Sequence, residues 1–154
     1  MDNTPAPRSY QRGRWHTLEN SVMSALVTAG LIPHCYLLTT VGRSTGRPRS
    51  NPVTIVLLQG RRWLVAPYGA VPWVLNARAA GDVTLARRGR AQRFTIRAAT
   101  AEEAGPVLQR YVTIAAATRS YFRAPPGAPA DDFAAEADQH PVFELLPFRR
   151  PDAA

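Results

Sequence analysis

The sequence predicts a mainly β (α+β) fold, a small antiparallel barrel with peripheral helices. Its 154 residues are enough for about one domain with a continuous core. Short runs rich in β-branched and aromatic residues alternate with turn-rich pieces, and few helical segments separate them, which is typical of small barrels. The chain shows no internal repeat and no second domain.

The first elements that we expect are an arm and a helix. Residues 1–14 are polar, with Pro and Gly, and predict a flexible arm before a single domain at 15–150. Within residues 15–29 the apolar side chains recur at steps of three and four, and Gly30 follows as a helix stop. The sequence therefore predicts an N-terminal amphipathic helix over 15–29.

Six β-type runs follow along the chain. Turn-rich pieces such as GRSTGRPR, QGR and RRGR separate them. The predicted strands are 35–41, 51–58, 62–67, 82–87, 91–98 and 141–148.

Three further helices are predicted between and after these strands. Residues 71–81 have Pro72 near the first turn and Gly81 past the end, an arrangement typical of a short helix. Thr100 and Glu103 have the spacing of a capping box, which opens a helix that runs to about Ala116. Residues 124–130 predict a loop, and a short acidic helix is expected at 131–138.

The basic charge is concentrated in the middle of the chain. All 19 basic residues are arginine, and residues 43–97 contain eleven of them against one aspartate, a local net charge of +10. The planar guanidinium suits phosphate and carboxylate, so this stretch predicts an anion-binding surface. Arg61 and Arg62 are expected to be ordinary solvated residues at a strand edge.

Other residue types exclude several classes of protein. Cys35 is the only cysteine, which fits a reducing compartment and a cytoplasmic location. No apolar run approaches the length of a membrane span. His16, His34 and His140 lie far apart without the spacing of metal ligands, so we expect no metal site.

Residues 42–46 spell the G-x-S-x-G motif of a hydrolase nucleophile elbow. An elbow needs a strand before the serine and a helix directly after it. Here Pro48 and Pro52 follow, and prolines so close together disfavour a helix start. Ser44 is therefore a weak candidate for a nucleophile, and the hydrolase is kept only as an alternative.

Three segments carry a resemblance to a known family. They are YLLTTVGRSTGRPRSNPVTIV, RWLVAPYGAVPWVLNARAAGDVTLARRG and HPVFEL. The T-T-x-G-R-x-x-G-x-P-R-x-x-P pattern from Thr39 to Pro52, followed by Trp73 and Asn76, is the most specific part. The chain resembles the deazaflavin-dependent nitroreductase family over residues 15–148. These are actinobacterial oxidoreductases with an FMN-binding split-barrel-like fold.

The resemblance implies a fold, a cofactor and a reaction. The fold is a split β-barrel, and the cofactor is coenzyme F420, an 8-hydroxy-5-deazaflavin, in preference to flavin mononucleotide. The reaction is hydride transfer between reduced F420 and a small organic acceptor, an activated alkene, enone, quinone or nitro compound. The alternative within the same fold is a lipid- or fatty-acid-binding or membrane-associated protein that catalyses no reaction.

The resemblance also implies which residues line the cofactor. Gly42 and Gly46 allow backbone amides to approach an anion, and the neighbouring arginines supply charge-assisted donors to the phosphate and the oligoglutamate tail. Residues 72–76 add a helix N-terminus, whose dipole favours negative charge. The predicted cofactor residues are Arg43, Ser44, Thr45, Gly46, Arg47, Arg49, Ser50, Asn51, Pro52, Val53, Val65, Ala66, Pro67, Tyr68, Pro72, Trp73 and Asn76.

The chain departs from the family pattern at two places. Ser44 replaces a lysine of many members, and Pro67-Tyr68 replaces Ser-Lys. Two cationic contacts to the tail are thus lost, for which Arg47 and Arg78 could compensate. Because Pro67 replaces the serine hydroxyl on the substrate side, the resemblance does not extend to nitroimidazole reduction.

Two tyrosines are the candidate catalytic residues. Tyr68 and Tyr121 can stack on a substrate and donate a proton to the product. A small-molecule substrate is expected and nucleic acid is not, because the arginines follow turns and no recognition motif is present. The helix at 15–29 allows weak membrane association, although it lacks a basic polar face. We expect a monomer or a homodimer.

Overall fold

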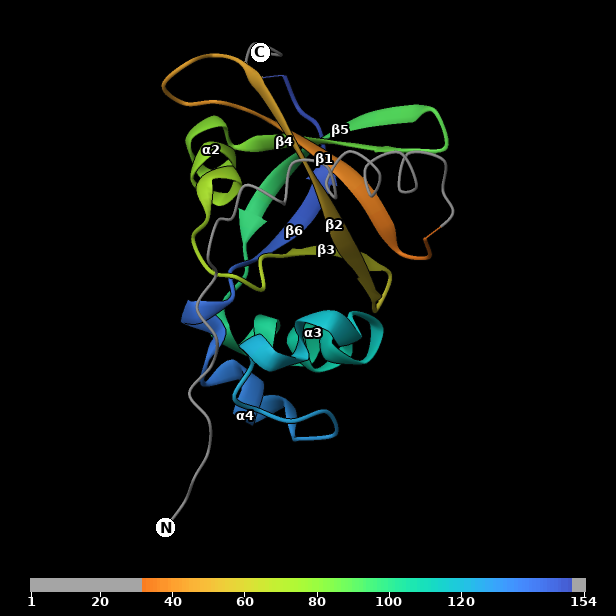
Figure 1. Ribbon diagram of the computed structural model, residues 1–154, viewed down its shortest axis with the longest axis vertical. Helices are drawn as coiled ribbons and strands as arrows, with labels where there is room; N and C mark the ends of the chain where they lie inside the picture. Colours follow the sequence, from red (N-terminus) through yellow and green to blue (C-terminus); the bar gives the residue numbers. More distant parts are fainter. Residues whose placement is uncertain (1–31, 151–154) are drawn as a thin grey trace.

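The computed structural model describes residues 32–150, so the arm at 1–14 and the helix at 15–29 lie outside the described residues. Six antiparallel strands form a closed barrel in the order β1-β2-β3-β6-β5-β4. Helices α3 and α4 lie together on one side of the barrel, and α2 lies at another (Figure 1). The strands are β1 (Cys35–Val41), β2 (Pro48–Leu58), β3 (Arg61–Val65), β4 (Asp82–Arg87), β5 (Arg90–Ala98) and β6 (Val142–Pro147).

The six predicted strands are confirmed, and their bounds differ by at most two residues from the prediction except at β2. The sequence predicted a strand from residue 51, whereas β2 begins at Pro48. Arg49 and Ser50 pair with Thr40 and Thr39 across the β1–β2 hairpin, so the ladder reaches almost to the turn. Pro48 is tolerated there because it is the first residue of its strand.

Two of the hairpins turn through pairs of residues with positive φ. Gln59 and Gly60 have φ of 53° and 71° between β2 and β3, and Arg88 and Gly89 have φ of 52° and 71° between β4 and β5. Two consecutive residues with positive φ match the twist of the strands that they join. These turns fix the register of both hairpins.

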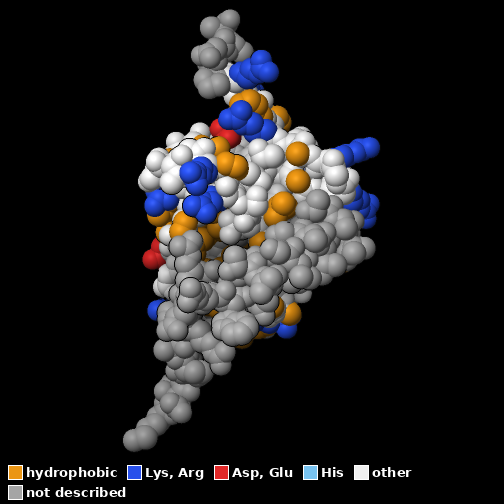
Figure 2. Space-filling model, turned by 45° about the horizontal axis from the view of Figure 1, so that its top comes forward, with side chains coloured by type: hydrophobic (Ala, Val, Ile, Leu, Met, Phe, Trp, Pro, Cys, Tyr) orange, Lys and Arg blue, Asp and Glu red, His pale blue; other side chains and the backbone are white. Residues whose placement is uncertain are grey.

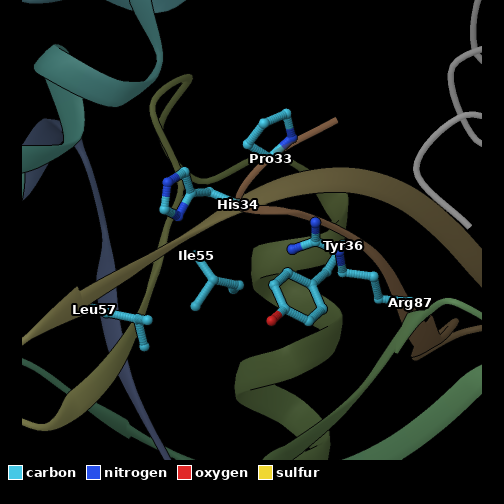
Figure 3. A pocket seen from close by; sticks show the side chains of 6 residues that line it. All are labelled: Pro33, His34, Tyr36, Ile55, Leu57 and Arg87. Atoms are coloured by element: carbon cyan, nitrogen blue, oxygen red, sulfur yellow. The ribbon is translucent and has the colours of Figure 1, made fainter. Parts of the chain in front are cut away.

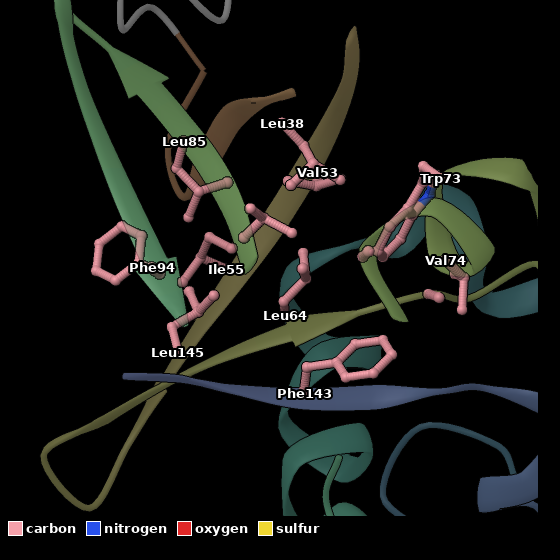
Figure 4. Packing of buried hydrophobic residues seen from close by; sticks show 13 residues of the cluster. Leu38, Val53, Ile55, Leu64, Trp73, Val74, Leu85, Phe94, Phe143 and Leu145 are labelled. Carbon is pink, nitrogen blue, oxygen red and sulfur yellow. The ribbon is translucent and has the colours of Figure 1, made fainter. Parts of the chain in front are cut away.

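The barrel interior holds one hydrophobic cluster. Side chains from all six strands meet there, and Trp73, Val74 and Ala77 of α2 (Pro72–Ala80) pack against them (Figure 4). A second cluster lies outside the barrel, where Val56 and Val65 contact α3 (Ala101–Ile114). Parts of β2 and β3 are covered on both faces, by the barrel interior and by α3. Their sequences are therefore continuous apolar runs and do not alternate between apolar and polar residues.

The helical segments differ in part from the sequence prediction. The capping box is confirmed, since the Glu103 amide donates to Thr100 Oγ1 at 3.2 Å and the Thr100 amide donates to Glu103 Oε1 at 3.0 Å. Helix α3 ends at Ile114, and the unpredicted 3₁₀ helix η1 (Ala116–Tyr121) follows. The acidic helix predicted at 131–138 is instead two short pieces, α4 (Ala130–Ala134) and the 3₁₀ helix η2 (Ala137–Gln139).

The close approach of α4 to α3 depends on a glycine. A Cβ atom at Gly105 would lie 2.7 Å from the Ala130 carbonyl oxygen, closer than van der Waals contact permits. Glycine thus sets the spacing of the two helices. Among residues 32–150, no helix has the length and apolar character needed to cross a membrane.

Candidate functional site

The arginine-rich turn joins β1 to β2 through residues 42–47. The Gly42 amide donates to the Arg47 carbonyl at 2.8 Å, and the Gly46 amide donates to the Gly42 carbonyl at 2.7 Å. Gly46 has a φ of 68°, and a Cβ atom at Gly42 would lie 2.6 Å from Thr45 Oγ1. The positive φ favours glycine at position 46, and the closeness of the Thr45 side chain favours it at position 42.

Ser44 lies within this turn, between two strands. A nucleophile elbow requires a helix directly after the serine, and β2 follows instead. The structure therefore lacks the strand-to-helix geometry that would expose an activated serine hydroxyl. The hydrolase interpretation has no structural support at this position.

A buried asparagine ties the turn to α2. Asn76 is 4% exposed, and its Oδ1 accepts hydrogen bonds from the Arg43 amide at 3.2 Å and from Arg43 Nη1 at 2.8 Å. The turn and α2 lie next to each other in Figure 1 as well. Asn76 is one of the predicted cofactor residues, and its side-chain oxygen positions the turn.

The arginines of the turn differ from those elsewhere in the barrel. We call Arg43, Arg47 and Arg49 the turn arginines; all three are exposed, and none forms an ion pair with a carboxylate among residues 32–150. We call Arg61, Arg93 and Arg97 the paired arginines, because each contacts a carboxylate. Arg47 and Arg49, together with the guanidinium donors of Arg43 that Asn76 does not use, are available for an external anion.

The surrounding surface is electropositive. Arginine side chains are spread over the face seen in Figure 2, where acidic side chains are few. The first turn of α2 contains no acidic residue. An anion approaching this part of the surface therefore meets little like charge.

The remaining predicted cofactor residues divide by exposure. Ser50, Asn51 and Pro52 are exposed or half-buried on β2, and Ser50 Oγ lies 3.0 Å from Thr39 Oγ1. By contrast, Val53, Ala66 and Trp73 belong to the barrel cluster, Val65 belongs to the outer cluster, and Pro67 is buried. Trp63 and Trp73 are both core aromatics, with exposures of 4% and 7%.

The structure brings the two candidate catalytic tyrosines together. Tyr68 follows β3 on the connection to α2, and Tyr121 ends η1, yet their ring centroids lie 4.6 Å apart at an interplanar angle of 74°. This is a favourable edge-to-face arrangement of aromatic rings. Tyr68 is 40% exposed, which is unusual for a large aromatic side chain, and leaves part of its ring accessible.

Sequence reasoning missed a buried pair beside these tyrosines. Glu136 Oε1 lies 2.7 Å from His140 Nε2, and the two residues are 4% and 3% exposed. His140 was considered only as a metal ligand. The spacing of four residues between Glu136 and His140 was the signal that could have indicated an interacting pair.

A separate cavity of about 280 Å³ lies at the other end of β1. Figure 3 shows its lining, in which the Arg87 guanidinium lies 5.4 Å from the centroid of the Tyr36 ring. The lining residues are Pro33, His34, Tyr36, Ile55, Leu57 and Arg87. None of them is a predicted cofactor or catalytic residue, and β1 separates this cavity from the turn.

Comparison with solved structures supports the fold. An F420-H2 dependent reductase (FDR-A) is 23% identical, with 73% of this chain and 94% of that chain covered and a TM-score of 0.50. A structure described as a domain-swapped dimer is 21% identical, with coverage of 86% and 95% and a TM-score of 0.52. A heme binding protein from Mycobacterium smegmatis is 14% identical, with coverage of 79% and 49% and a TM-score of 0.52. No curated protein matches the chain.

The closed antiparallel barrel with peripheral helices places the chain in the split-barrel fold class, and the arginine-rich turn adds an electropositive surface to it. The family model of the F420H(2)-dependent quinone reductases matches residues 14–124. The chain belongs to this family, and its cofactor is coenzyme F420. The family resemblance seen in the sequence is thereby confirmed.

The residues of the turn fit the chemistry of F420. The coenzyme ends in a phosphate and an oligoglutamate tail, and the turn offers three unpaired arginines together with the hydroxyls of Ser44, Thr45 and Ser50. The turn uses the amides of Gly42, Gly46 and Arg47 internally, and the Arg43 amide donates to Asn76. Among residues 32–150 no partner faces the amides of Ser44 and Thr45, which therefore add two donors.

Proposed function

We propose that this reductase transfers a hydride from reduced F420 to a flat conjugated acceptor of the quinone or enone class. The observation that carries the proposal is the group of turn arginines without carboxylate partners. Their turn is held through Arg43 by Asn76, on the helix that follows Tyr68. Activated alkenes and nitro compounds are the other acceptors that fit the same site.

The turn arginines hold the anionic part of the coenzyme in this proposal. Arg47 and Arg49 supply charge-assisted hydrogen bonds to phosphate or carboxylate, and Ser44 and Thr45 add hydroxyl and amide donors. Ser50, Asn51 and Pro52 of β2 provide an exposed wall for the deazaflavin ring. Since the Val65 and Ala66 side chains are buried, these residues contribute backbone groups or support only.

The coenzyme supplies a hydride when bound in its reduced form. The protein orients the acceptor, excludes water and provides a proton. Tyr68 and Tyr121 offer ring edges and faces for a flat acceptor, and each carries a hydroxyl that can protonate the product oxygen or carbon. A quinone gains the hydride and one proton in this reaction and leaves as a hydroquinone.

Two measurements test the proposal. Oxidised F420 at micromolar concentration should change its fluorescence saturably on titration with the protein, and flavin mononucleotide should bind more weakly. Consumption of reduced F420, followed by absorbance, should then accelerate on addition of a soluble naphthoquinone. Copurification of flavin mononucleotide without saturable F420 binding would refute the cofactor assignment, and an unchanged rate with every acceptor class would refute the reaction.

A further inference from the structure

Glu136 and His140 form a buried pair between the two segments that carry the tyrosines. They are 4% and 3% exposed and lie 2.7 Å apart through Oε1 and Nε2. Neither residue has a part in the reaction described above. Among residues 32–150, the hydrogen bonds and ring contacts of their side chains outside the pair all go to Pro67 and to residues 122–124, close to Tyr68 and Tyr121 in the sequence.

On one side the pair holds the segment of Tyr68. His140 Nδ1 lies 2.8 Å from the Pro67 carbonyl oxygen. Because a carbonyl oxygen can only accept, Nδ1 carries the proton of this hydrogen bond. Pro67 directly precedes Tyr68, so the bond fixes the backbone from which the Tyr68 side chain projects.

On the other side the pair holds the segment of Tyr121. The Glu136 carboxylate accepts hydrogen bonds from the Arg123 amide at 3.1 Å and from the Ala124 amide at 2.9 Å. The Phe122 ring stacks on the His140 ring, with centroids 4.0 Å apart and an interplanar angle of 27°. All three contacted residues directly follow Tyr121.

The arrangement has the features of a positioning device rather than of a simple stabilising contact. A buried polar pair contributes little net stability compared with apolar residues of similar volume. Its hydrogen bonds are directional, however, and here they link two segments that are about fifty residues apart in the sequence. The ends of these segments meet in the edge-to-face contact of Tyr68 and Tyr121.

We propose that Glu136 and His140 are positioning residues that set the geometry of the Tyr68–Tyr121 pair and so the orientation of the acceptor. The inference rests on the proposed role of the two tyrosines. It assigns to the pair no contact with substrate or coenzyme, because the pair acts through the backbone at Pro67 and at residues 123–124.

Three variants separate positioning from folding. Glu136→Ala removes the hydrogen bonds to the Arg123 and Ala124 amides and the bond to His140, so the 123–124 segment is no longer joined to the residue that holds Pro67. Glu136→Gln preserves it, since the amide oxygen accepts from the two backbone amides and the NH₂ group donates to His140 Nε2. The double variant Glu136→Gln/His140→Phe keeps the 122–124 side and the ring stacking but loses the bond to Pro67.

We expect the first and third variants to lower the efficiency of acceptor reduction without weakening the binding of F420. In Glu136→Ala and in the double variant, kcat/KM for the naphthoquinone should fall at least about tenfold, because small misplacements of reacting groups are costly. The dissociation constant of F420 should change by less than about twofold. Glu136→Gln should stay within about threefold of the wild type.

A matched control addresses general destabilisation. Val83→Ala removes buried methyl groups from the barrel cluster, on β4 and away from the pair. It should lower Tm while leaving kcat/KM for the naphthoquinone and the dissociation constant of F420 near the wild-type values. Loss of kcat/KM in this variant equal to that in Glu136→Ala would overturn the inference.

A measurement without coenzyme or substrate completes the test. In protein labelled at tyrosine, nuclear Overhauser contacts between the Tyr68 and Tyr121 rings should be present in the wild type and in Glu136→Gln, and lost in the double variant. Retention of these contacts in the double variant would overturn the inference. If the wild type reduces no acceptor, the proposed function fails, while the ring contacts still decide whether the pair positions the tyrosines.

Discussion

The turn arginines and the paired arginines are the same type of residue used in two ways. Arg97 donates to Glu103 at 2.7 Å and also contacts Glu144, and Arg93 donates to Asp82 at 2.9 Å. The turn arginines have no such partner among residues 32–150, and Arg43 is held by a neutral amide oxygen. Composition alone therefore does not identify an anion site, because the partners of each cation decide whether its charge is available.

The largest expected effect comes from removing a turn arginine. Arg43→Ala and Arg49→Ala should each raise the dissociation constant of F420 about tenfold or more, since a charge-assisted hydrogen bond contributes roughly 1.5–3 kcal/mol. Fluorescence titration of oxidised F420 measures the change. Arg43→Ala should also loosen the turn, because Arg43 contacts Asn76 through both its amide and its guanidinium.

Arg61 and Arg62 provide matched controls for these variants. Arg61 lies 3.6 Å from Glu144 with its side chain 56% exposed, and the Arg62 guanidinium lies 5.7 Å from the centroid of the Phe94 ring. Arg61→Ala and Arg62→Ala should barely change F420 binding. The contrast should shrink with added salt, because exposed charges are screened within about 10 Å at moderate ionic strength. Equal small effects at all four positions would mean that the basic surface acts only as a diffuse field.

The contrast between the two groups of arginines also shows how far the sequence could lead. The strands followed from apolar runs and turn residues, and the arginine turn followed from its motif. The pairing of Arg49 with Thr40 could not be foreseen, because a strand start depends on hydrogen bonds across the hairpin that local propensity does not encode. The sequence therefore predicted β2 three residues too short.

The contacts of the site that could not be predicted from the sequence all join segments that are far apart along the chain. Asn76 meets Arg43 across 33 residues, and His140 meets Pro67 across 73. The acidic helix predicted at 131–138 is interrupted after Ala134, and at the break the Glu136 carboxylate accepts from the amides of Arg123 and Ala124. Such buried polar contacts satisfy backbone groups that helical periodicity does not reveal.

A smaller effect is expected when the turn keeps its shape but loses net charge. In Asn76→Asp the carboxylate can still accept from the Arg43 amide and guanidinium, and it turns Arg43 into a paired arginine. The dissociation constant of F420 should rise about fivefold to tenfold. Asn76→Ala is the control, because it should lower the free energy of unfolding by about 1–3 kcal/mol through the unsatisfied donors that it leaves. Wild-type affinity in Asn76→Asp would show that the charge of Arg43 is not used.

A substitution at Ser44 tests the contribution of a single neutral hydrogen bond to F420 binding. Ser44→Ala should weaken F420 binding by about 0.5–1.5 kcal/mol and leave turnover at saturating coenzyme nearly intact. The backbone amide of residue 44 stays in place, which limits the loss. An esterase assay on the wild type and on this variant is the control. Hydrolysis that disappears in Ser44→Ala would restore the nucleophile that the strand–turn–strand geometry argues against.

The smallest expected effect on coenzyme binding comes from changing Glu103, the carboxylate partner of Arg61 and Arg97. Hydrogen bonds from Arg97 and from the Thr100 amide lower the pKa of Glu103 to about 2, and Glu103 in turn raises the pKa of Arg97. A carboxylate with a depressed pKa stabilises the fold above its unfolded pKa of about 4.3, and this contribution disappears as the pH falls toward the folded value.

Glu103→Gln should therefore be less stable than the wild type at neutral pH, with a difference that narrows between about pH 4.3 and pH 2. Chemical denaturation across this range measures it. F420 binding at neutral pH should be unchanged, because Glu103 contacts Arg61 and Arg97 and none of the turn arginines. A shift in F420 affinity in Glu103→Gln comparable to that in Arg49→Ala would mean that the two groups of arginines are coupled, and that pairing alone does not determine which cations bind the coenzyme.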